Sequence, residues 1–195
     1  DVVDRAEAKA IGDKNPDSFL HVDRAEMDLP DDTDLYDSKV YERARQNLLN
    51  MEKNGVMKQD ETPCYYIYEL TRKGKTQTGL VGCCSIDDYM KGIVKKHELT
   101  REDKEQDRIR HVDTCDANTG PIFLTYKKSD VVDSIVSEWI SSHNPEYDFV
   151  SDGVEQTVWV VDDSETVNKI SSAFERVQSM YIADGHHRCA SAVKV

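Results

Sequence analysis

The sequence predicts a mixed α/β (α+β) fold, in which a mixed sheet contains two hairpins and is flanked by helices. Two pairs of β-type runs, each pair joined by a short turn, argue against a purely parallel sheet. Between these pairs, apolar residues recur at helical spacing. The chain of 195 residues is 38% hydrophobic and shows neither repeats nor low-complexity linkers, which predicts a single domain over residues 1–195.

The first part of the chain is predicted to be helical. Residues 4–11 form a helical pattern, and a turn at residues 15–18, Asn-Pro-Asp-Ser, precedes the apolar run 19–22. Apolar residues at helical spacing predict a second helix over residues 35–53. The following Asn54-Gly55 is a typical helix end.

The middle of the chain begins with a predicted hairpin. Residues 63–72 are rich in Tyr and β-branched side chains, and a Lys-Gly-Lys turn separates them from a second apolar run at 78–86. A helix is expected over 85–95. Another is expected from Thr100, because Thr100 and Asp103 have the spacing of a capping box.

The last part of the chain alternates strands and helices. The expected elements, in order, are a strand at 120–126, a helix at 130–142, a hairpin at 147–161, a helix at 163–177 and a strand at 180–183. The hairpin is expected to turn at Asp152-Gly153, because that pair favours a tight two-residue turn.

Charge and cysteine content narrow the class of protein. The formal net charge is −13, which would repel a nucleic acid backbone, so we expect no nucleic acid partner. No apolar run reaches the roughly 20 residues that cross a bilayer, so we expect no membrane partner. Five cysteines without Cys-x-x-Cys spacing indicate a reduced, cytoplasmic protein, with Cys83 and Cys84 on opposite faces of a strand.

Both ends of the sequence have the features of a fragment. The chain starts at Asp1 without an initiator Met, and a helical pattern runs to Val195 without a stop signal. We therefore expect a longer protein, truncated at both ends.

The segment 184–188, Asp-Gly-His-His-Arg, is the most informative motif. It follows a short apolar strand and precedes a helix, and the first amides of a helix attract anions. Gly185 allows a tight turn, Asp184 is a suitable N-cap, and Arg188 offers donors for phosphate or carboxylate. With His186 and His187 alongside, the motif indicates a site for a phosphorylated or acidic small molecule. The alternative is a capped helix whose histidines make local hydrogen bonds.

A second charged segment covers residues 95–108. If it is helical, Arg101, Lys104 and Arg108 share one face and could contact an anion. His97 and Glu98 precede that helix, and Glu98 could serve as a general base or metal ligand if the segment meets the first motif. The zinc-protease pattern His-Glu-x-x-His is not met, because position 101 is Arg. The alternative is a surface helix with exposed ion pairs.

Other polar residues are expected to be structural. His111 and His143 are predicted to lie on the surface, and His21 to be a hydrogen-bonded core histidine. Cys189 is expected to be a small buried residue, although a helix N-terminus could lower the pKa of its thiol.

Taken together, these motifs resemble the bacterial and archaeal family called domain of unknown function 1015. The resemblance covers the whole chain and supplies no activity. It rests on short sequence motifs that occur in a specific order. These motifs are Asp1-Val2, Asn15-Pro16-x-Ser18-Phe19-Leu20-His21-Val22, Tyr65-Tyr66-Ile67-Tyr68, His97-Glu98-x-Thr100 with Lys104 and Asp107-Arg108, Gly120-Pro121-Ile122-Phe123, and Ala183-Asp184-Gly185-His186-His187-Arg188.

The Asp-Gly-His-His-Arg phrase is also similar to the nucleotide-binding loop of the ParB/sulfiredoxin-like superfamily, which includes free serine kinases. That resemblance implies a phosphate cradle formed by Gly185, His186 and His187, with Arg188 as a phosphate clamp. Sulfiredoxin carries a reactive Cys where His186 stands, and ParB carries Glu-Arg-Arg at 186–188, so the kinase variant has the most similar loop.

Three functions are therefore expected as alternatives. The first is a nucleotide-dependent phosphotransferase or phosphohydrolase of a small metabolite, using ATP, ADP or CTP with Mg²⁺. Its catalytic residues would be Asp184, His187 and Glu98, and Asp184 and Glu98 would also be the metal ligands. The second is a non-catalytic module that binds a small anion or has a regulatory role. The third is a metal-dependent hydrolase using His186, His187 and Glu98.

Overall fold

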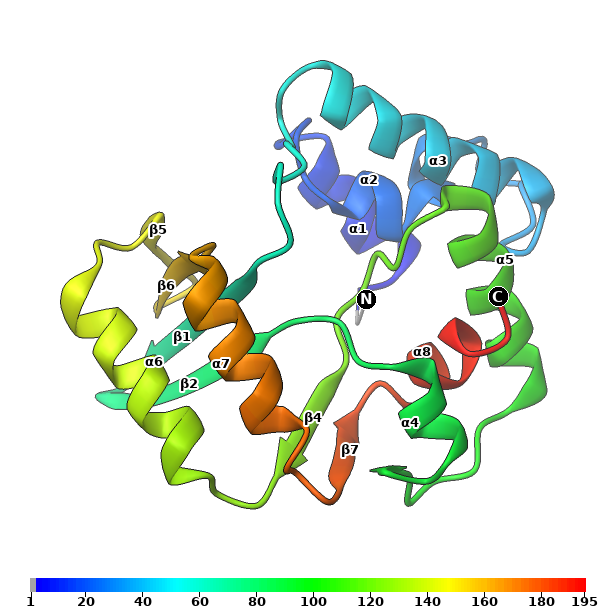
Figure 1. The fold of residues 1–195 in the computed structure, drawn as a ribbon. Helices are drawn as coiled ribbons and strands as arrows, with labels where there is room; N and C mark the ends of the chain where they lie inside the picture. Colours follow the sequence, from blue (N-terminus) through cyan, green and yellow to red (C-terminus); the bar gives the residue numbers. More distant parts are fainter. Residues whose placement is uncertain (1–2) are drawn as a thin grey trace. The chain divides into compact units, whose positions relative to one another are not determined.

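The computed structural model describes residues 3–195 and confirms the mixed α/β fold class. The chain forms two compact units, each assembled from separate stretches of sequence (Figure 1). Unit 1 contains the described residues up to Gln59, together with Lys95–Leu124 and Tyr181–Val195. Unit 2 contains Asp60–Val94 and Thr125–Met180.

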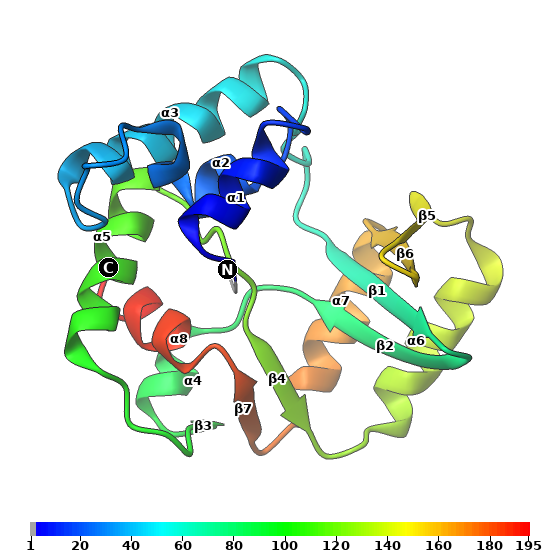
Figure 2. The same ribbon diagram turned by 180° about the vertical axis from the view of Figure 1, so that it is seen from behind.

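Unit 1 is mainly helical. Its helices are α1 (Arg5–Gly12), α2 (Leu20–Asp23), the 3-10 helix η1 (Ala25–Asp28), α3 (Ser38–Lys53), α5 (Glu102–Cys115) and α8 (His186–Ala192). Helix α5 packs against both α3 and α8, and Figure 2 shows α8 beside α5. A small core of Ala25, Val40, Ala44 and Cys115 closes the contact between the N-terminal helices and α5. The helix expected at 35–53 is confirmed, and its end at Asn54-Gly55 is confirmed by a positive φ of 74° at Gly55.

Unit 2 is built around a four-stranded antiparallel sheet with strand order β2-β1-β6-β5. Its strands are β1 (Tyr65–Arg72), β2 (Lys75–Val81), β5 (Tyr147–Ser151) and β6 (Val154–Val161), and its helices are α4 (Ile86–Met90), α6 (Asp130–Ser142) and α7 (Ser164–Phe174). Both predicted hairpins are confirmed. Each turns through two residues with positive φ, which matches the right-handed twist of the strands.

One face of this sheet carries the core of unit 2. Ile67 pairs with Leu80 on one side and with Trp159 on the other, so these side chains share a face. They pack against Trp139 of α6 and Ile170 of α7, two helices that lie side by side in Figure 1. The side chains on this face of the sheet and those of α6 and α7 therefore form one apolar layer.

A second sheet has the strand order β3-β7-β4, formed by β3 (Val94–Lys95), β7 (Met180–Asp184) and β4 (Phe123–Tyr126). The chain passes from one unit to the other within each of these strands. Strands β4 and β7 confirm the predicted runs near 120–126 and 180–183. The two-residue strand β3 was not predicted, because its stretch was assigned to a helix over 85–95.

Several predicted boundaries and caps are wrong. The second hairpin strand ends at Val81 rather than 86, so Cys83 and Cys84 lie beyond it and share no strand. Helix α4 stops at Met90, and Gly92, with a φ of 72°, follows it. The expected capping box at Thr100 is absent, because the N-cap is Arg101 and the Thr100 hydroxyl donates to Glu105 instead.

No helix within residues 3–195 is both long enough and apolar enough to cross a membrane.

Candidate functional site

The Asp-Gly-His-His-Arg motif forms the predicted strand-to-helix turn, with a different cap. Strand β7 runs through Asp184, and Gly185 is the N-cap of α8, with a φ of 89°. The prediction that Asp184 caps the helix is therefore wrong. An added Cβ at Gly185 would lie 3.5 Å from Ile122, an ordinary contact, so the positive φ rather than crowding requires glycine here.

The turn brings His186 to the segment that follows β3. Its imidazole Nδ1 lies 3.7 Å from Oε2 of Glu98, and Nε2 of His97 lies 3.8 Å from the other carboxylate oxygen of Glu98. The rings of His97 and His186 meet edge to face, with centroids 4.5 Å apart. One ligand atom from each of the three residues lies within 4.8 Å of the others. All three residues belong to unit 1.

Strand order explains this meeting of distant residues. His97 and Glu98 follow β3, and His186 follows β7. Because β3 and β7 are neighbours in the three-stranded sheet, the segments that leave them start close together. The condition stated for Glu98, that its segment meets the Asp184–Arg188 motif, is fulfilled.

The environment of the three residues differs. His186 is buried, and its Nε2 has no hydrogen-bond partner among the described residues. His97 and Glu98 keep about 62% of their side-chain surface exposed. The cluster therefore has a buried side formed by the imidazole of His186 and an open side formed by His97 and Glu98.

These distances are too long for hydrogen bonds and suit an ion. A pair of polar atoms about 3.6 Å or more apart does not form a hydrogen bond. In contrast, ligand atoms around a tetrahedral Zn²⁺, with bonds of about 2.1 Å, lie roughly 3.4 Å from one another. The spacings of 3.7 and 3.8 Å involve different oxygens of Glu98, and the three ligand atoms lie within 4.8 Å of one another, so the side chains would have to move closer together to bind one ion.

His187 and Arg188 make different contacts from His186. Nε2 of His187 accepts a hydrogen bond from the backbone N–H of Arg101, at 3.2 Å. Arg188 donates from Nη1 to the carbonyl of Pro121 at 2.8 Å, and its guanidinium lies against Gly120. Both side chains thus connect α8 to neighbouring segments of unit 1.

Of the three residues predicted to share a basic helical face, Lys104 and Arg108 lie on α5 and Arg101 is the N-cap residue before it, and all three have protein partners. Arg101 pairs with Asp103, with Nη2 and Oδ2 at 2.7 Å, and Arg108 pairs with Asp107 at 3.0 Å. Nζ of Lys104 donates to the hydroxyl of Tyr36 at 3.4 Å.

Sequence reasoning missed two residues of this region. The first is His97, which was noted beside Glu98 but was not included among the predicted site residues. The second is Glu105, a buried acid on α5 that accepts from Thr100 and from Lys194. Asp184, which was included, is not a member of the cluster in the described part of the chain.

The predictions for the histidines outside the site and for Cys189 were correct only in part. His21 is hydrogen-bonded to Asp28 at 2.9 Å, as predicted, but it is partly buried and does not lie in the core. Cys189 is buried, as predicted. The surface assignment of His111 is wrong, because this residue is 3% exposed and its Nε2 donates to the carbonyl of Val22. Burial lowers the pKa of His111. His143 is exposed, as predicted, and stacks on Trp139.

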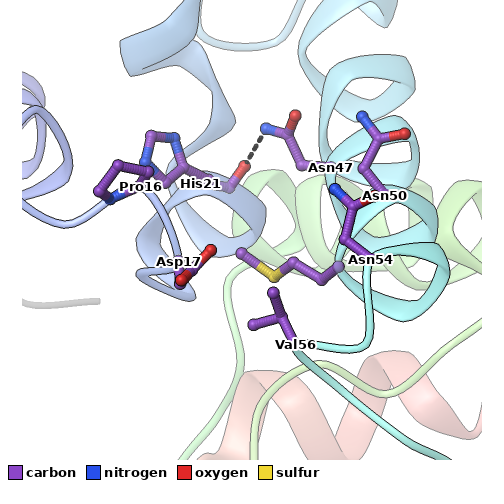
Figure 3. Close-up of a pocket in the computed structure, with 8 residues that line it drawn as sticks. Pro16, Asp17, His21, Asn47, Asn50, Asn54 and Val56 are labelled. Carbon is purple, nitrogen blue, oxygen red and sulfur yellow. Dashed lines mark hydrogen bonds between the residues drawn. The ribbon is translucent and has the colours of Figure 1, made fainter.

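Unit 1 also has a shallow cavity of about 180 Å³ between α2 and α3 (Figure 3). Asn47 lines it and donates to the backbone carbonyl of His21, the contact drawn in the figure. The other lining residues are Pro16, Asp17, His21, Asn50, Met51, Asn54 and Val56. None of the predicted site residues lies in this cavity.

The chain belongs to a family described as "Protein of unknown function (DUF1015)", whose model matches residues 1–195. This match confirms the resemblance to domain of unknown function 1015. No curated protein and no solved structure matches the chain. The nucleotide loop implied by the ParB/sulfiredoxin-like resemblance stays a prediction.

Proposed function

We propose that this protein is a metal-dependent hydrolase whose substrate is a small anionic metabolite such as a phosphate ester. The observation that carries the proposal is the cluster of His97, Glu98 and His186, with ligand atoms within 4.8 Å of one another. Two imidazoles and one carboxylate are a ligand set of catalytic zinc sites, where three protein ligands leave a position open. The same set also accepts other first-row divalent ions.

The chemistry of this set follows from its ligands. Neutral imidazole nitrogens and one carboxylate hold a divalent ion and leave it a net positive charge. When bound, such an ion acts as a Lewis acid and lowers the pKa of water towards neutrality. The exposed side of the cluster, at His97 and Glu98, is open to water and substrate.

The surroundings favour an anionic substrate. Lys95 and Lys96 precede His97, Arg101 follows it shortly after, and Arg188 belongs to the same motif as His186. Residues 95–108 hold five basic and five acidic side chains, so this segment has a formal net charge of zero in a chain with a net charge of −13 and repels anions less than the rest of the molecule.

A nucleotide-dependent phosphotransferase using ATP, ADP or CTP with Mg²⁺ is the second candidate. The specific observation for it is the position of the Asp184–Arg188 motif beside Glu98. Mg²⁺ prefers oxygen ligands and retains several waters, so two imidazoles at the cluster favour Zn²⁺ or a similar ion instead. For this reason we rank hydrolysis with an imidazole-bound ion first.

Metal binding is the direct test. Chelator-treated protein should take up one equivalent of Zn²⁺ or Co²⁺ in competition titrations. His97→Ala and Glu98→Gln should each weaken binding by more than about 100-fold, since loss of outer-shell partners alone costs about 10–100-fold. The matched control His143→Ala changes an exposed histidine of unit 2 and should leave binding unchanged. Equal affinities for all these proteins would refute the site.

Turnover separates the candidate functions. Release of inorganic phosphate from phosphate monoesters by the metal-loaded protein, lost in Glu98→Gln, supports the hydrolase. Thermal stabilisation by ATP, ADP or CTP with Mg²⁺, together with phosphate transfer to an acceptor, supports the second candidate. Metal binding without turnover on any of these compounds would indicate the non-catalytic module.

A further inference from the structure

Glu105 is a buried carboxylate that the proposed chemistry does not use. It lies in the first part of α5 and is 5% exposed. Its two oxygens accept hydrogen bonds from the hydroxyl of Thr100 and from Nζ of Lys194. A buried ionised carboxylate is costly unless such partners compensate its lost hydration, and both contacts favour the charged form of Glu105.

The two partners of Glu105 come from the two segments that carry the cluster. Thr100 lies just after His97 and Glu98, on the segment that joins β3 to α5. Lys194 lies just after α8, the helix that begins with His186. One carboxylate therefore joins two segments that lie far apart in the sequence, since Lys194 is 89 positions from Glu105.

Helix α8 is attached to this segment at its start and just beyond its end. At its first residue, His186 faces Glu98, and at the next residue, His187 accepts from the amide of Arg101. Beyond its last residue, Lys194 reaches Glu105. Three contacts spread along a short helix fix both its position and its rotation, and the rotation decides where the ring of His186 points.

We propose that Glu105 is a positioning residue of the metal site, because its bonds to Thr100 and Lys194 hold His186 against His97 and Glu98. This inference rests on the proposed function. It assigns Glu105 no contact with the ion. Its role is to keep the two ligand-bearing segments at the separation that places three ligand atoms around one ion.

The charge on Glu105 is central to this role. Hydrogen bonds from Lys194 and, to a smaller extent, from Thr100 hold the pKa of Glu105 below its usual value, so the carboxylate is ionised at neutral pH. The carboxylate side chain is 7% exposed, whereas Lys194 is 52% exposed. Replacing the carboxylate therefore removes the attraction from the buried end of the pair and leaves the lysine able to return to water.

The test compares Glu105→Gln with the matched control Glu102→Gln in the full 195-residue chain. The Glu105→Gln substitution keeps the size of the side chain and an acceptor for Thr100 but removes the charge that attracts Lys194. Glu102 is an exposed acid on the same helix. Co²⁺ is the probe, because its visible absorption reports the number and geometry of its ligands.

Glu105→Gln is expected to weaken Co²⁺ binding by about 10–100-fold, the usual effect of losing an outer-shell partner, and to change the Co²⁺ absorption spectrum. Glu102→Gln should match the unmodified chain in both measurements. Urea unfolding of the metal-free proteins is measured in parallel. A loss of stability without any change in Co²⁺ affinity or spectrum would reveal a purely structural role and overturn the inference.

Lys194→Met covers the case in which Glu105→Gln does not fold. It removes the exposed half of the pair and should weaken Co²⁺ binding. Lys194→Arg should bind Co²⁺ like the unmodified chain, because a guanidinium can still reach the carboxylate. Co²⁺ affinity in Lys194→Met equal to that of the unmodified chain would overturn the inference.

The same experiment distinguishes the two proposals. If the unmodified chain binds no Co²⁺, both the metal site and the role of Glu105 are refuted. If it binds Co²⁺ and both variants bind equally well, only the role of Glu105 is refuted.

Discussion

Gly185→Ala should destabilise unit 1 by about 1–2 kcal/mol, because an L-residue in the left-handed helical region costs roughly that amount through contact between its Cβ and the backbone. Gly185 has φ 89° and ψ 32°, close to that region. The nearest atoms to an added Cβ belong to Ile122, at 3.5 Å, which is a normal van der Waals contact. The expected loss of stability therefore comes from the residue's own backbone conformation and not from a clash with Ile122.

Urea unfolding, with the denaturation midpoint and its slope measured separately, is the assay. A change of about 1–2 kcal/mol corresponds to about a 5–30-fold change in the folded-to-unfolded ratio. Gly55→Ala is the matched control, because Gly55 has a φ of 74°, lies in the same unit and has no atom within 4 Å of an added Cβ. The two variants should lose similar stability.

The comparison can refute the reasoning in two ways. If Gly185→Ala loses less than about 0.5 kcal/mol while Gly55→Ala loses about 1 kcal/mol or more, the turn before α8 does not require a left-handed residue. If Gly185→Ala loses several kcal/mol more stability than Gly55→Ala, the contact with Ile122 is tighter than 3.5 Å. The assumption that an added Cβ does not clash with Ile122 would then be wrong.

Two further predictions concern unit 1. Gly120→Ala should cost about 1 kcal/mol, because its Cβ would lie 3.0 Å from Nε of Arg188 and would displace the guanidinium from the carbonyl of Pro121. In a double-mutant cycle the cost should fall in an Arg188→Ala background, and an unchanged cost would rule out this contact. Asp23→Asn should gain stability relative to the unmodified chain as the pH rises from about 3 to 7. Burial raises the pKa of Asp23 in the folded protein above 3.8. The contribution of Asp23 to folding stability is therefore fully present below a pH of 3.8 and is lost as the pH rises through the folded-state pKa. Urea unfolding at several pH values measures the difference, which would be constant with pH if Asp23 were solvated.

The elements with strong local signals could be predicted from the sequence. Both hairpins and the helix α6 follow from residue periodicity and turn residues, because the preferences at these positions are local. Val94-Lys95 could not be recognised as a strand, since two residues carry no periodicity and their pairing depends on a partner far along the chain.

The candidate site could be predicted only in part, because it too depends on contacts between distant segments of the chain. A His-Glu pair ahead of one helix and a His-His pair at the start of another are visible in the sequence, and their meeting was stated as a condition. Which of the four residues would converge could not be deduced, because adjacent residues at the start of a helix point in directions about 100° apart. The structure turns His186 towards Glu98, and His187 towards the amide of Arg101.

The burial of Glu105 shows why charge patterns along a helix are ambiguous. In the sequence, Glu105 is one of several acids in a dense run that indicates a solvated surface helix. The decisive partner is Lys194, which is 89 positions away, so no local pattern distinguishes Glu105 from the exposed Glu102. A buried acid at this position is stable only if the chain brings a cation to it. The contact that compensates Glu105 also joins α5 to the residues just beyond α8, and in the proposal made above the geometry at His186 depends on this same ion pair.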